Sequence, residues 1–503
     1  MFLTDDSLHN YKRCQRRAFL DLYGDYREKS GERDFLRKIH QESQKHLQEV
    51  ISDFEYINVK ATKIDINEKE VSSYQQEKIN ITEALMAQGV EVIYQGIITC
   101  NNIEDILIPE KNTKNILNSF PEGITFIGYP TLLIKIPGKS KFGDWLYFPI
   151  NIKFGGRPKS EYKLIGAFHA WILSKIQGVL SPHSTLILRN KKQYNINLDN
   201  WLIPLEEIIN NFLEMSAQKI EPEVFISRQR CGLCFWYNHC YKIAQNQNHL
   251  SLIPGITPKR YLQLQHLKIN TVESLSKLSP TILGEYLGGK VALQLQQQAE
   301  SIVTNKALLK PKYNKYKFKI PTNDIEIYFD IEAEPDISLD YLLGALLINR
   351  KEKTQKFYPF LAEKIEDEGK IWQDFLDFLN QYPQAPIFHF SDYEKDTINR
   401  LSALYKTDNK ERLKILERCV DLHHIVIHSV TAPVENYSLK SLGNWLGFQW
   451  HNHGVSGDQC VWWYDQWLKK GDRKFLDLIL RYNEDDCLAT FHLKNWLADF
   501  LKS

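Results

Sequence analysis

The chain has 503 residues, of which 43% are hydrophobic and 25% are charged, and its net charge is +1. This length predicts two to four domains with cores of their own, and the composition excludes a disordered or fibrous protein. The near-neutral charge points to no class of partner, so any nucleic-acid-binding surface has to be local. The first eleven residues lack the apolar core of a signal peptide, and no apolar run is long enough to span a membrane. We therefore expect a cytoplasmic protein that does not enter membranes.

Four of the eight cysteines form a pattern typical of a metal site. Cys231, Cys234 and Cys240 follow one another at C-x2-C-x5-C spacing, and three such thiols can converge on one ion or cluster. A fourth ligand is needed for tetrahedral coordination, and either Cys14 or His239 could supply it. In a reducing compartment this spacing favours a metal over disulfides. An iron–sulfur cluster, zinc and a thiol cluster without metal all stay open.

The segment between these cysteines alternates in the way that strands do. Strands are predicted over 91–99, 124–136 and 145–154, with a Pro137-Gly138 turn between the last two. A helix is predicted over 161–176, ending before Gly178. The N-terminal half is therefore expected to be an α/β domain.

The cysteine near the N-terminus and the C-x2-C-x5-C motif far downstream, on either side of an α/β segment, resemble the iron-staple nucleases. These form the RecB-like branch of the PD-(D/E)XK fold. The resemblance implies a restriction-endonuclease-like domain over residues 1–245. It also implies a four-iron four-sulfur cluster, with these ligands: Cys14, Cys231, Cys234 and Cys240. His40 matches the family's metal-contacting histidine, and the alternative is a surface histidine on a helix.

The catalytic acids of that family are absent from this chain. Thr131, in a G-Y-P-T-L-L stretch, stands where the family has aspartate, and Asn151 stands where an acid two residues before Lys153 is expected. The glutamine of the following helix is replaced by Ile165. Because Thr131 and Asn151 are neutral, the site has lost the anionic ligands that hold Mg²⁺, and a lysine without a metal-activated water does not cleave. We expect a degenerate site in a module that holds DNA or RNA with the help of Lys153, unless Asp144 substitutes in an altered geometry.

Residues 246–305 predict a helical connector. The stretch that begins Leu252-Ile-Pro-Gly255 resembles a helix-hairpin-helix element, in which a glycine turn frees backbone N–H groups to bind phosphate. The alternative is an ordinary helical connector.

A basic segment follows the connector. From Lys306 to Lys319 there are six lysines and no acid, with Tyr313 and Tyr316 among them. Positive charge interleaved with aromatic rings suits a surface that binds phosphates and stacks on bases, and the alternative is a solvated linker. The lysines expected to contact nucleic acid are Lys310, Lys312, Lys315 and Lys317.

The stretch from Ile327 to Glu332 predicts a buried strand that carries two acids. Side chains on a strand alternate, so Asp330 and Glu332 project from the same face. Two neighbouring acids on a buried face repel each other unless a cation lies between them. Mg²⁺ or Mn²⁺ suits such oxygen ligands, and the alternative is an edge strand with both acids in water.

Two later segments add more acids. The stretch from His389 to Glu394 predicts a strand that enters a helix, with a further acid at the helix start. Tyr482 and Asp486 are four residues apart on the predicted last helix and therefore share one face. Further strands are predicted over 341–348 and 354–361, and helices over 370–382 and from Ser438 to Gly447. Carboxylates from three separate segments exceed what a fold keeps for stability alone.

This arrangement resembles the DEDD exonucleases, in the YprB-like branch of the RNase H fold, over residues 320–503. Asp330 and Glu332 match the D-x-E strand, and Tyr482 and Asp486 match the Y-x-x-x-D helix. Glu394 matches the third acid, where the family has aspartate, and Asp392 is the alternative. The resemblance implies that two Mg²⁺ or Mn²⁺ ions are held by Asp330, Glu332, Glu394 and Asp486, and that Tyr482 orients the attacking water.

Together the two resemblances describe an α/β chain in which a RecB-like domain, a helical connector and an RNase H-like domain follow one another. They imply a 3′–5′ exonuclease for single-stranded DNA or RNA, with a role in DNA repair or RNA turnover. One alternative is a non-catalytic nucleic-acid-binding scaffold with two degenerate nuclease folds. Another is a nuclease in which the N-terminal half cuts.

Overall fold

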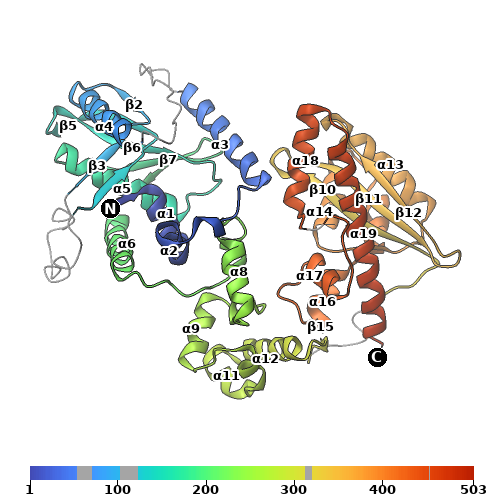
Figure 1. Ribbon diagram of the computed structural model, residues 1–503. Coiled ribbons are helices and arrows are strands. Elements are labelled where there is room, and N and C mark those ends of the chain that lie inside the picture. The colour runs from blue at the N-terminus through green and yellow to red at the C-terminus, as the bar shows by residue number, and fades with distance from the viewer. Residues whose placement is uncertain (54–70, 102–122, 312–319, 453, 503) are drawn as a thin grey trace. The chain divides into compact units, whose positions relative to one another are not determined.

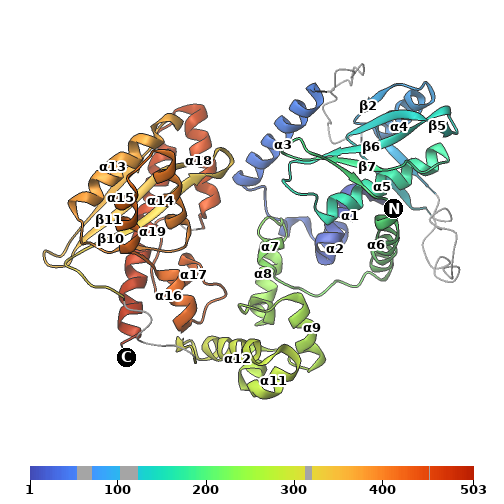
Figure 2. The ribbon, with the colours of Figure 1, turned by 180° about the vertical axis from the view of Figure 1, so that it is seen from behind.

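The computed structural model describes residues 1–53, 71–101, 123–311, 320–452 and 454–502. Contacts within the chain divide it into two units, Met1–Tyr241 and Lys242–Ser503. Figures 1 and 2 show the elements of each unit from opposite sides. None of the described helices is both long and apolar enough to cross a membrane.

The first unit is built on a mixed five-stranded sheet with the order β2-β5-β6-β7-β8. Its strands are β2 (Val92–Tyr94), β5 (Leu132–Ser140), β6 (Gly143–Ile152), β7 (Ser184–Ile187) and β8 (Gln193–Ile196). β5 is antiparallel to β6, β7 is parallel to β6, and β8 is antiparallel to β7. Because parallel strands need a crossover, the helix α5 (Ser160–Gln177) connects β6 to β7.

A second, three-stranded sheet of this unit has the order β1-β4-β3. Its strands are β1 (Phe2–Thr4), β4 (Thr125–Gly128) and β3 (Ile98–Cys100). The stretches 91–99 and 124–136 were each predicted as one strand, but each divides into two strands that enter different sheets. The first divides at Gln95, whose φ is +52°, and the second divides at Pro130, which has no N–H group to continue a strand ladder.

The predicted turn at Pro137-Gly138 is also wrong. β5 continues through these residues to Ser140, with an irregular register between Pro137 and Ser140, and the turn follows at residues 141–142. The other helices of the first unit are α1 (Asp5–Arg13), α2 (Gln15–Tyr23), α3 (Asp34–Ser52), α4 (Val71–Ala87), α6 (Asp199–Gln218) and α7 (Arg228–Cys231), and α8 (Tyr237–Asn246) follows them.

The second unit begins with a group of short helices, as predicted for this stretch. They are α9 (Pro258–His266), α10 (Val272–Lys277), α11 (Pro280–Leu287) and α12 (Gly289–Thr304). The side chains of Thr257, Thr271 and Ser279 accept backbone N–H groups at the starts of the first three helices. The buried Gln298 of α12 donates to the carbonyl oxygen of Ala432 over 2.6 Å. The short strand β9 (Leu308–Leu309) pairs with β15 (Val430–Thr431), so these helices are fixed to the domain that follows.

That domain is organised around a five-stranded sheet with the order β12-β11-β10-β13-β14. The strands are β10 (Ile325–Glu334), β11 (Leu339–Asn349), β12 (Thr354–Leu361), β13 (Ile387–His389) and β14 (Cys419–Asp421). β10, β11 and β12 are antiparallel neighbours, whereas β13 and β14 continue the sheet in parallel with β10. The helices are α13 (Glu368–Gln381), α14 (Tyr393–Leu404), α15 (Asn409–Arg418), α16 (Leu422–Ser429), α17 (Leu439–Trp445), α18 (Gly457–Lys470) and α19 (Lys474–Phe500).

Alternate residues of β10 face different helices. The ring of Phe329 stacks on Phe375 of α13 with 4.7 Å between centroids. Tyr328, which points the other way, meets Phe491 of α19 at 5.1 Å. Because strand side chains alternate, Asp330 and Glu332 share the face of Tyr328 and lie beneath α19, the long helix in Figure 1.

Candidate active site

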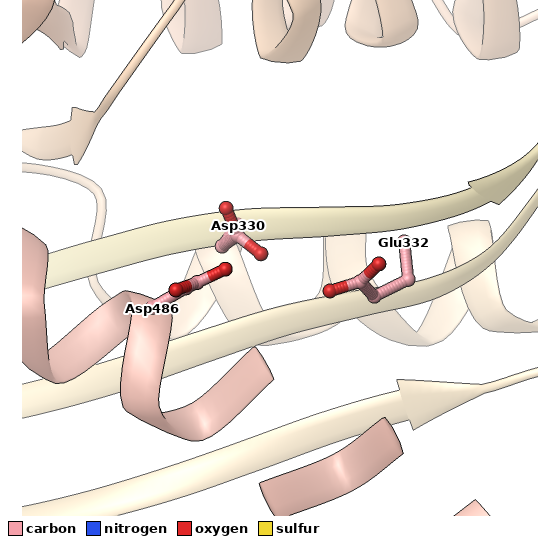
Figure 3. A group of neighbouring side chains, drawn as sticks. All are labelled: Asp330, Glu332 and Asp486. Carbon is pink, nitrogen blue, oxygen red and sulfur yellow. The ribbon is translucent and has the colours of Figure 1, made fainter. Parts of the chain in front are cut away.

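Three acids gather where α19 packs on β10. Carboxylate oxygens of Asp330 and Glu332 on β10 and of Asp486 on α19 lie within 4.8 Å of one another, and Figure 3 shows them turned toward a common point. Within the described part of the chain, this is the only group of three or more His, Cys, Asp or Glu ligand atoms that approach so closely. Two of the three segments predicted to share a site are therefore brought together.

Close approach of α19 to the sheet depends on a glycine. Gly344 of β11 is the register partner of Asp330, and a Cβ atom at this glycine would lie 1.6 Å from Oδ1 of Asn483. The absence of a side chain at Gly344 lets the fully buried Asn483 enter the site. Its Nδ2 donates to Oδ2 of Asp330 over 2.7 Å, so the amide fixes the orientation of that carboxylate.

The acids destabilise one another in their charged forms. Burial raises the pKa of Asp330 well above its usual value, and the charges of Asp486, Glu332 and Glu394 raise it further. Burial and Asp486 likewise raise the pKa of Glu332. The pKa of Asp486 is raised to about 7 by burial, although a hydrogen bond from Trp450 lowers it. A divalent cation bound among these oxygens would relieve the repulsion.

Glu394, the fourth predicted acid, lies outside the group of three. It is buried at the start of α14, where Ser391 Oγ donates to its Oε2 over 2.8 Å, and His389 Nδ1 is 3.5 Å from the same oxygen. Its charge is nevertheless among those that raise the pKa of Asp330. Asp392, the alternative, is exposed, so Glu394 is the acid of this segment that acts on the cluster.

Tyr482 lies one turn before Asp486 and is 7% exposed. Burial and then the neighbouring charges of Asp486 and Glu332 raise the pKa of its phenol far above the usual value. The hydroxyl group therefore stays protonated near neutral pH and can donate a hydrogen bond inside the site.

Several residues that support the acids were not predicted. Trp450 Nε1 donates to Oδ1 of Asp486 over 2.7 Å. His451 engages Asp485 twice, through its backbone N–H at 2.9 Å and through Nδ1 at 2.7 Å. The buried thiol of Cys460 is hydrogen-bonded to Glu332. The position of Asn483, three residues before Asp486 on one helix face, was a readable signal, whereas the other contacts join segments that sequence spacing does not connect.

The four predicted cluster cysteines gather in the first unit. Burial raises the pKa of the Cys231 thiol to about 11, and the charges of Cys14, Cys234 and Cys240 raise it further. The backbone N–H of Ser227 donates to Cys231 Sγ over 3.3 Å. His239, the other ligand considered, has its Nδ1 3.6 Å from a carboxylate oxygen of Glu28. The thiols converge, and no three of their sulfurs, all in described residues, lie within 4.8 Å of one another.

Only part of the predicted degenerate site is engaged within the fold, because Nδ2 of the buried Asn151 has no hydrogen-bond partner among the described residues. Thr131 Oγ1 accepts the backbone N–H of Ile152 over 3.1 Å, and Asn151 is 1% exposed. Lys153 follows β6 directly. Burial lowers the pKa of His9, and the charges of Arg13 and Lys153 lower it further. Ile165 is part of the buried core of α5.

Two candidates in this unit lie elsewhere. His40 is on the surface of α3, and its Nδ1 is 2.6 Å from Glu32, so the surface alternative describes it. The histidine of α3 that faces inward is His46, which is buried beside Phe154. Asp144 is exposed at the opposite end of β6 from Asn151, so it does not substitute for the missing acid.

The ammonium group of Lys310 is engaged by the backbone of the second unit rather than open to a ligand. Its Nζ donates to the carbonyl oxygen of Ile427 over 2.5 Å, and its backbone N–H donates to Ser429 over 2.9 Å. Burial lowers its pKa. The other lysines predicted for nucleic-acid binding, Lys312, Lys315 and Lys317, lie outside the described residues, as do Tyr313 and Tyr316.

Comparison with known proteins gives one family match. A model of the RNase H superfamily matches residues 327–498, about a third of the chain. No curated protein matches the chain. The matched segment begins on β10 and ends on α19, so it contains every residue of the acidic cluster. The C-terminal domain thus has an RNase H-like fold, which points to a nuclease-type function and to binding of divalent metal and nucleic acid.

Proposed function

We propose that the protein is a metal-dependent nuclease whose C-terminal domain removes nucleotides from the 3′ end of single-stranded DNA or RNA. The observation that carries the proposal is the buried group of Asp330, Glu332 and Asp486, whose charges no neighbouring cation of the described chain neutralises fully. Lys440 acts on Asp486, but one partly buried lysine does not balance three acids.

The donor set fits hard divalent ions. Asp330, Glu332 and Asp486, with Glu394 nearby, would hold two Mg²⁺ or Mn²⁺ ions, because these ions prefer carboxylate oxygens. When bound, such ions lower the pKa of a water molecule and stabilise the leaving oxygen. The protein's own part is to orient these ligands through Asn483 and Trp450.

Tyr482 completes the proposed site. Its neutral phenol can donate to a water or to a phosphate oxygen, and its burial beside Asp486 supports a role next to the proposed metal ligands. The resemblance to the DEDD exonucleases, in which the matching tyrosine orients the water, supports this role.

The direct test is Mn²⁺-dependent degradation of 5′-labelled single-stranded DNA and RNA oligonucleotides by the full chain. We expect a ladder of fragments shortened from the 3′ end, and we expect Asp330→Asn to abolish it. Asp374→Asn, the same change at an exposed position of α13, serves as the matched control. Equal activity of wild type and Asp330→Asn would contradict the assignment.

For the N-terminal unit we propose a nucleic-acid-holding domain of the PD-(D/E)XK type. The order of an antiparallel β5–β6 pair, the crossover α5 and the parallel β7 supports this fold. The neutral Thr131 and Asn151 support a loss of catalysis. Lys153→Ala is therefore expected to weaken binding of single strands and to spare cleavage. Loss of cleavage in Lys153→Ala, with Asp330→Asn unimpaired, would move the nuclease to this unit.

We also propose that Cys14, Cys231, Cys234 and Cys240 hold a four-iron four-sulfur cluster. A tetrahedral zinc ion, about 2.3 Å from each sulfur, would set the sulfurs about 3.8 Å apart, but no three of these described sulfurs lie within 4.8 Å of one another. The wider spacing favours a larger centre.

The cluster proposal has a readout that does not depend on cleavage. The anaerobically purified full chain should be brown and contain iron, and Cys231→Ser should lose both. Cys100→Ala, at a buried cysteine of β3, should keep both. A colourless protein containing zinc would overturn the iron assignment.

The second candidate function is a nucleic-acid-binding scaffold without catalysis. The neutral side chains at Thr131 and Asn151 favour it for the N-terminal unit. A protein that binds oligonucleotides but leaves them intact in Mn²⁺ would establish it for the whole chain.

A further inference from the structure

A cavity of about 290 Å³ lies in the segment between α17 and α18. Its lining includes Lys440, Asn444, Phe448, Gln449, Trp450 and Asn452. Its volume is at the small end of ligand pockets, which are roughly 300–1,000 Å³. A cavity of this size suits one nucleotide rather than a longer stretch of strand.

One wall of the cavity touches the acidic cluster. Trp450 lines the cavity and also donates through Nε1 to Oδ1 of Asp486 over 2.7 Å. Phe448, another lining residue, meets Trp450 edge to face with 4.8 Å between ring centroids. A ligand in the cavity would therefore lie beside the proposed metal ligands, with aromatic surface next to it.

The polar lining has the composition that a nucleotide needs. Lys440 is the only cation among the described lining residues, and its Nζ lies 5.9 Å from the centroid of the Trp450 ring while donating to the Val455 carbonyl oxygen. Asn444 and Gln449 are exposed amides. Amides both donate and accept, so they can meet the edge of a base.

Asn452 provides a separate observation. It lines the cavity, and its Nδ2 is buried without a hydrogen-bond partner among the described residues. A buried amide N–H group without an acceptor costs free energy, and a ligand that brings an acceptor would remove that cost.

We propose that this cavity binds the 3′-terminal nucleotide of the substrate. Lys440 faces its phosphate, the amides of Asn452, Asn444 and Gln449 meet the base, and Trp450 and Phe448 supply apolar contact. This inference rests on the proposed exonuclease function and makes the cavity the part of the site that recognises the base.

The test compares two 5′-labelled single strands that differ only in the last nucleotide, which carries a base in one and is abasic in the other. The measured quantity is the ratio of kcat/KM for removal of that nucleotide. We expect wild type to favour the base-bearing end by about 10-fold, from stacking and hydrogen bonds. Asn452→Leu and Asn444→Trp should bring the ratio close to one. Gln381→Leu, at an exposed amide at the end of α13, should retain it.

A binding measurement keeps the cavity testable if no strand is cut. We expect calorimetric titration to give a Kd for a nucleoside 5′-monophosphate about 10-fold lower than for deoxyribose 5-phosphate, and Asn452→Leu to remove that difference. Cleavage that depends on Asp330 but shows no preference for a base would overturn the cavity proposal alone. Absence of cleavage with preserved nucleotide binding would overturn the nuclease proposal alone. Equal affinity for the two phosphates in wild type would also overturn the cavity proposal.

Discussion

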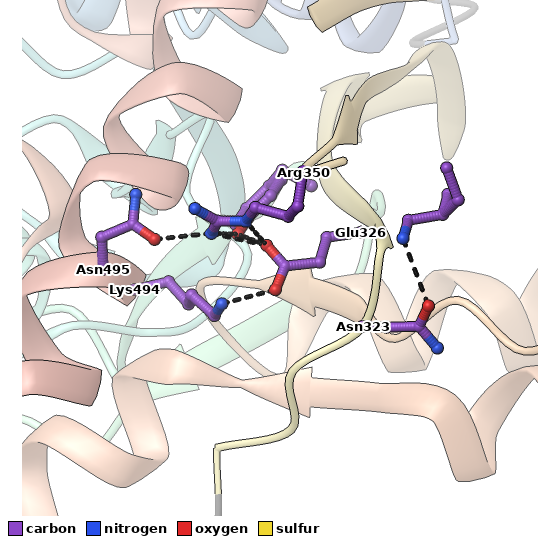
Figure 4. Close-up of polar contacts among 7 residues, drawn as sticks. Asn323, Glu326, Arg350, Lys494 and Asn495 are labelled. Atoms are coloured by element: carbon purple, nitrogen blue, oxygen red, sulfur yellow. Dashed lines mark hydrogen bonds and ion pairs between the residues drawn. The ribbon is translucent and has the colours of Figure 1, made fainter. Parts of the chain in front are cut away.

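The two ends of β10 treat buried carboxylates in opposite ways. Glu326 accepts from Lys494 Nζ and from Arg350 Nη2, each over 2.6 Å, as Figure 4 shows. Burial alone would raise the pKa of Glu326, but these partners hold it below its usual value. Asp330, four residues on and on the same face, receives one neutral amide from Asn483 and faces other acids, and its pKa is raised.

The difference between Glu326 and Asp330 shows which buried carboxylate the fold pairs with cationic side chains of its own. At Glu326 the protein pairs a buried charge for stability, because an unpaired one would be costly. At Asp330 it gathers like charges, which we propose an ion from solution neutralises. Perturbed acids in such a setting are typical of a functional site.

Asp486→Asn should produce the largest effect, because it removes one ligand from the acid end. We expect the rate of oligonucleotide cleavage in Mn²⁺ to fall by at least about 1,000-fold, since a metal contributes several kcal/mol to such reactions. The control is Asp374→Asn, which is exposed. A fall of less than tenfold would remove Asp486 from the proposed ligands.

The second prediction concerns pH and the metal-free protein. The pKa of Asp486 is about 7 in the folded chain against an ordinary value of 3.8, so the folded state binds the additional proton between these values. The contribution of Asp486 to the free energy of unfolding should then fall as pH rises from about 4 to about 7, by about 1.4 kcal/mol per pH unit and roughly 4 kcal/mol in all.

This dependence is measured by urea unfolding of wild type and Asp486→Asn without metal. The transition to follow is the one that moves to higher urea concentration when Mg²⁺ is added to wild type, because it reports the domain that holds the site. Asp486→Asn should show a smaller fall than wild type, because it removes one of three acids whose pKa values are raised, and it should be more stable than wild type at pH 7.5 until Mg²⁺ is added. If the free energy of unfolding changed with pH in the same way in the two proteins, the pKa of Asp486 would not be raised in the folded chain.

Glu326→Gln tests the paired end of β10. It leaves Lys494, which is 3% exposed, without its carboxylate. We expect a loss of about 3 kcal/mol in the free energy of unfolding. Cleavage by the folded fraction should persist. Glu352→Gln, at an exposed position, is the control, and unchanged stability in Glu326→Gln would mean that this ion pair is not structural.

Gly344→Ala should damage the acid end through packing. The new methyl group would collide with Asn483, so we expect a loss of about 2 kcal/mol in stability together with slower cleavage. Adding Asn483→Ala should recover part of the stability, which is a signature of direct contact. Gly457→Ala, where a Cβ meets nothing within 4 Å, should be neutral.

Trp450→Phe should have the smallest effect. It removes the hydrogen bond to Asp486 and keeps an aromatic ring, so we expect kcat/KM to fall by about 10-fold. The acid limb of the pH–rate profile should move upward, because this hydrogen bond lowers the pKa of Asp486. Trp467→Phe removes a hydrogen bond to the Glu363 carbonyl oxygen and none to Asp486. It should therefore not move the pH–rate profile.

Local spacing made part of this site predictable. The period of two on β10 placed Asp330 and Glu332 on one face, and the four-residue spacing placed Tyr482 with Asp486. The meeting of β10 with α19 followed only from the resemblance. The contact of Trp450 with Asp486 joins residues 36 positions apart, and no periodic pattern announces such a contact.

Where predictions were left open or differ from the structure, the physical causes are similar. His40 and His46 both lie on α3, and their residue type does not show which one faces the sheet. Lys310 was predicted to contact nucleic acid because of its charge, but its ammonium group donates a hydrogen bond to a carbonyl oxygen of α16. The strand predicted over 124–136 ignored Pro130, which ends one strand before β5 begins in another sheet.

The most direct test of the central claim is a Mn²⁺ titration of the full chain, followed by electron paramagnetic resonance without nucleic acid. We expect bound Mn²⁺ in wild type and Asp374→Asn and a large loss of binding in Asp330→Asn. Asp330→Asn that binds Mn²⁺ with the affinity and stoichiometry of wild type would contradict the central claim.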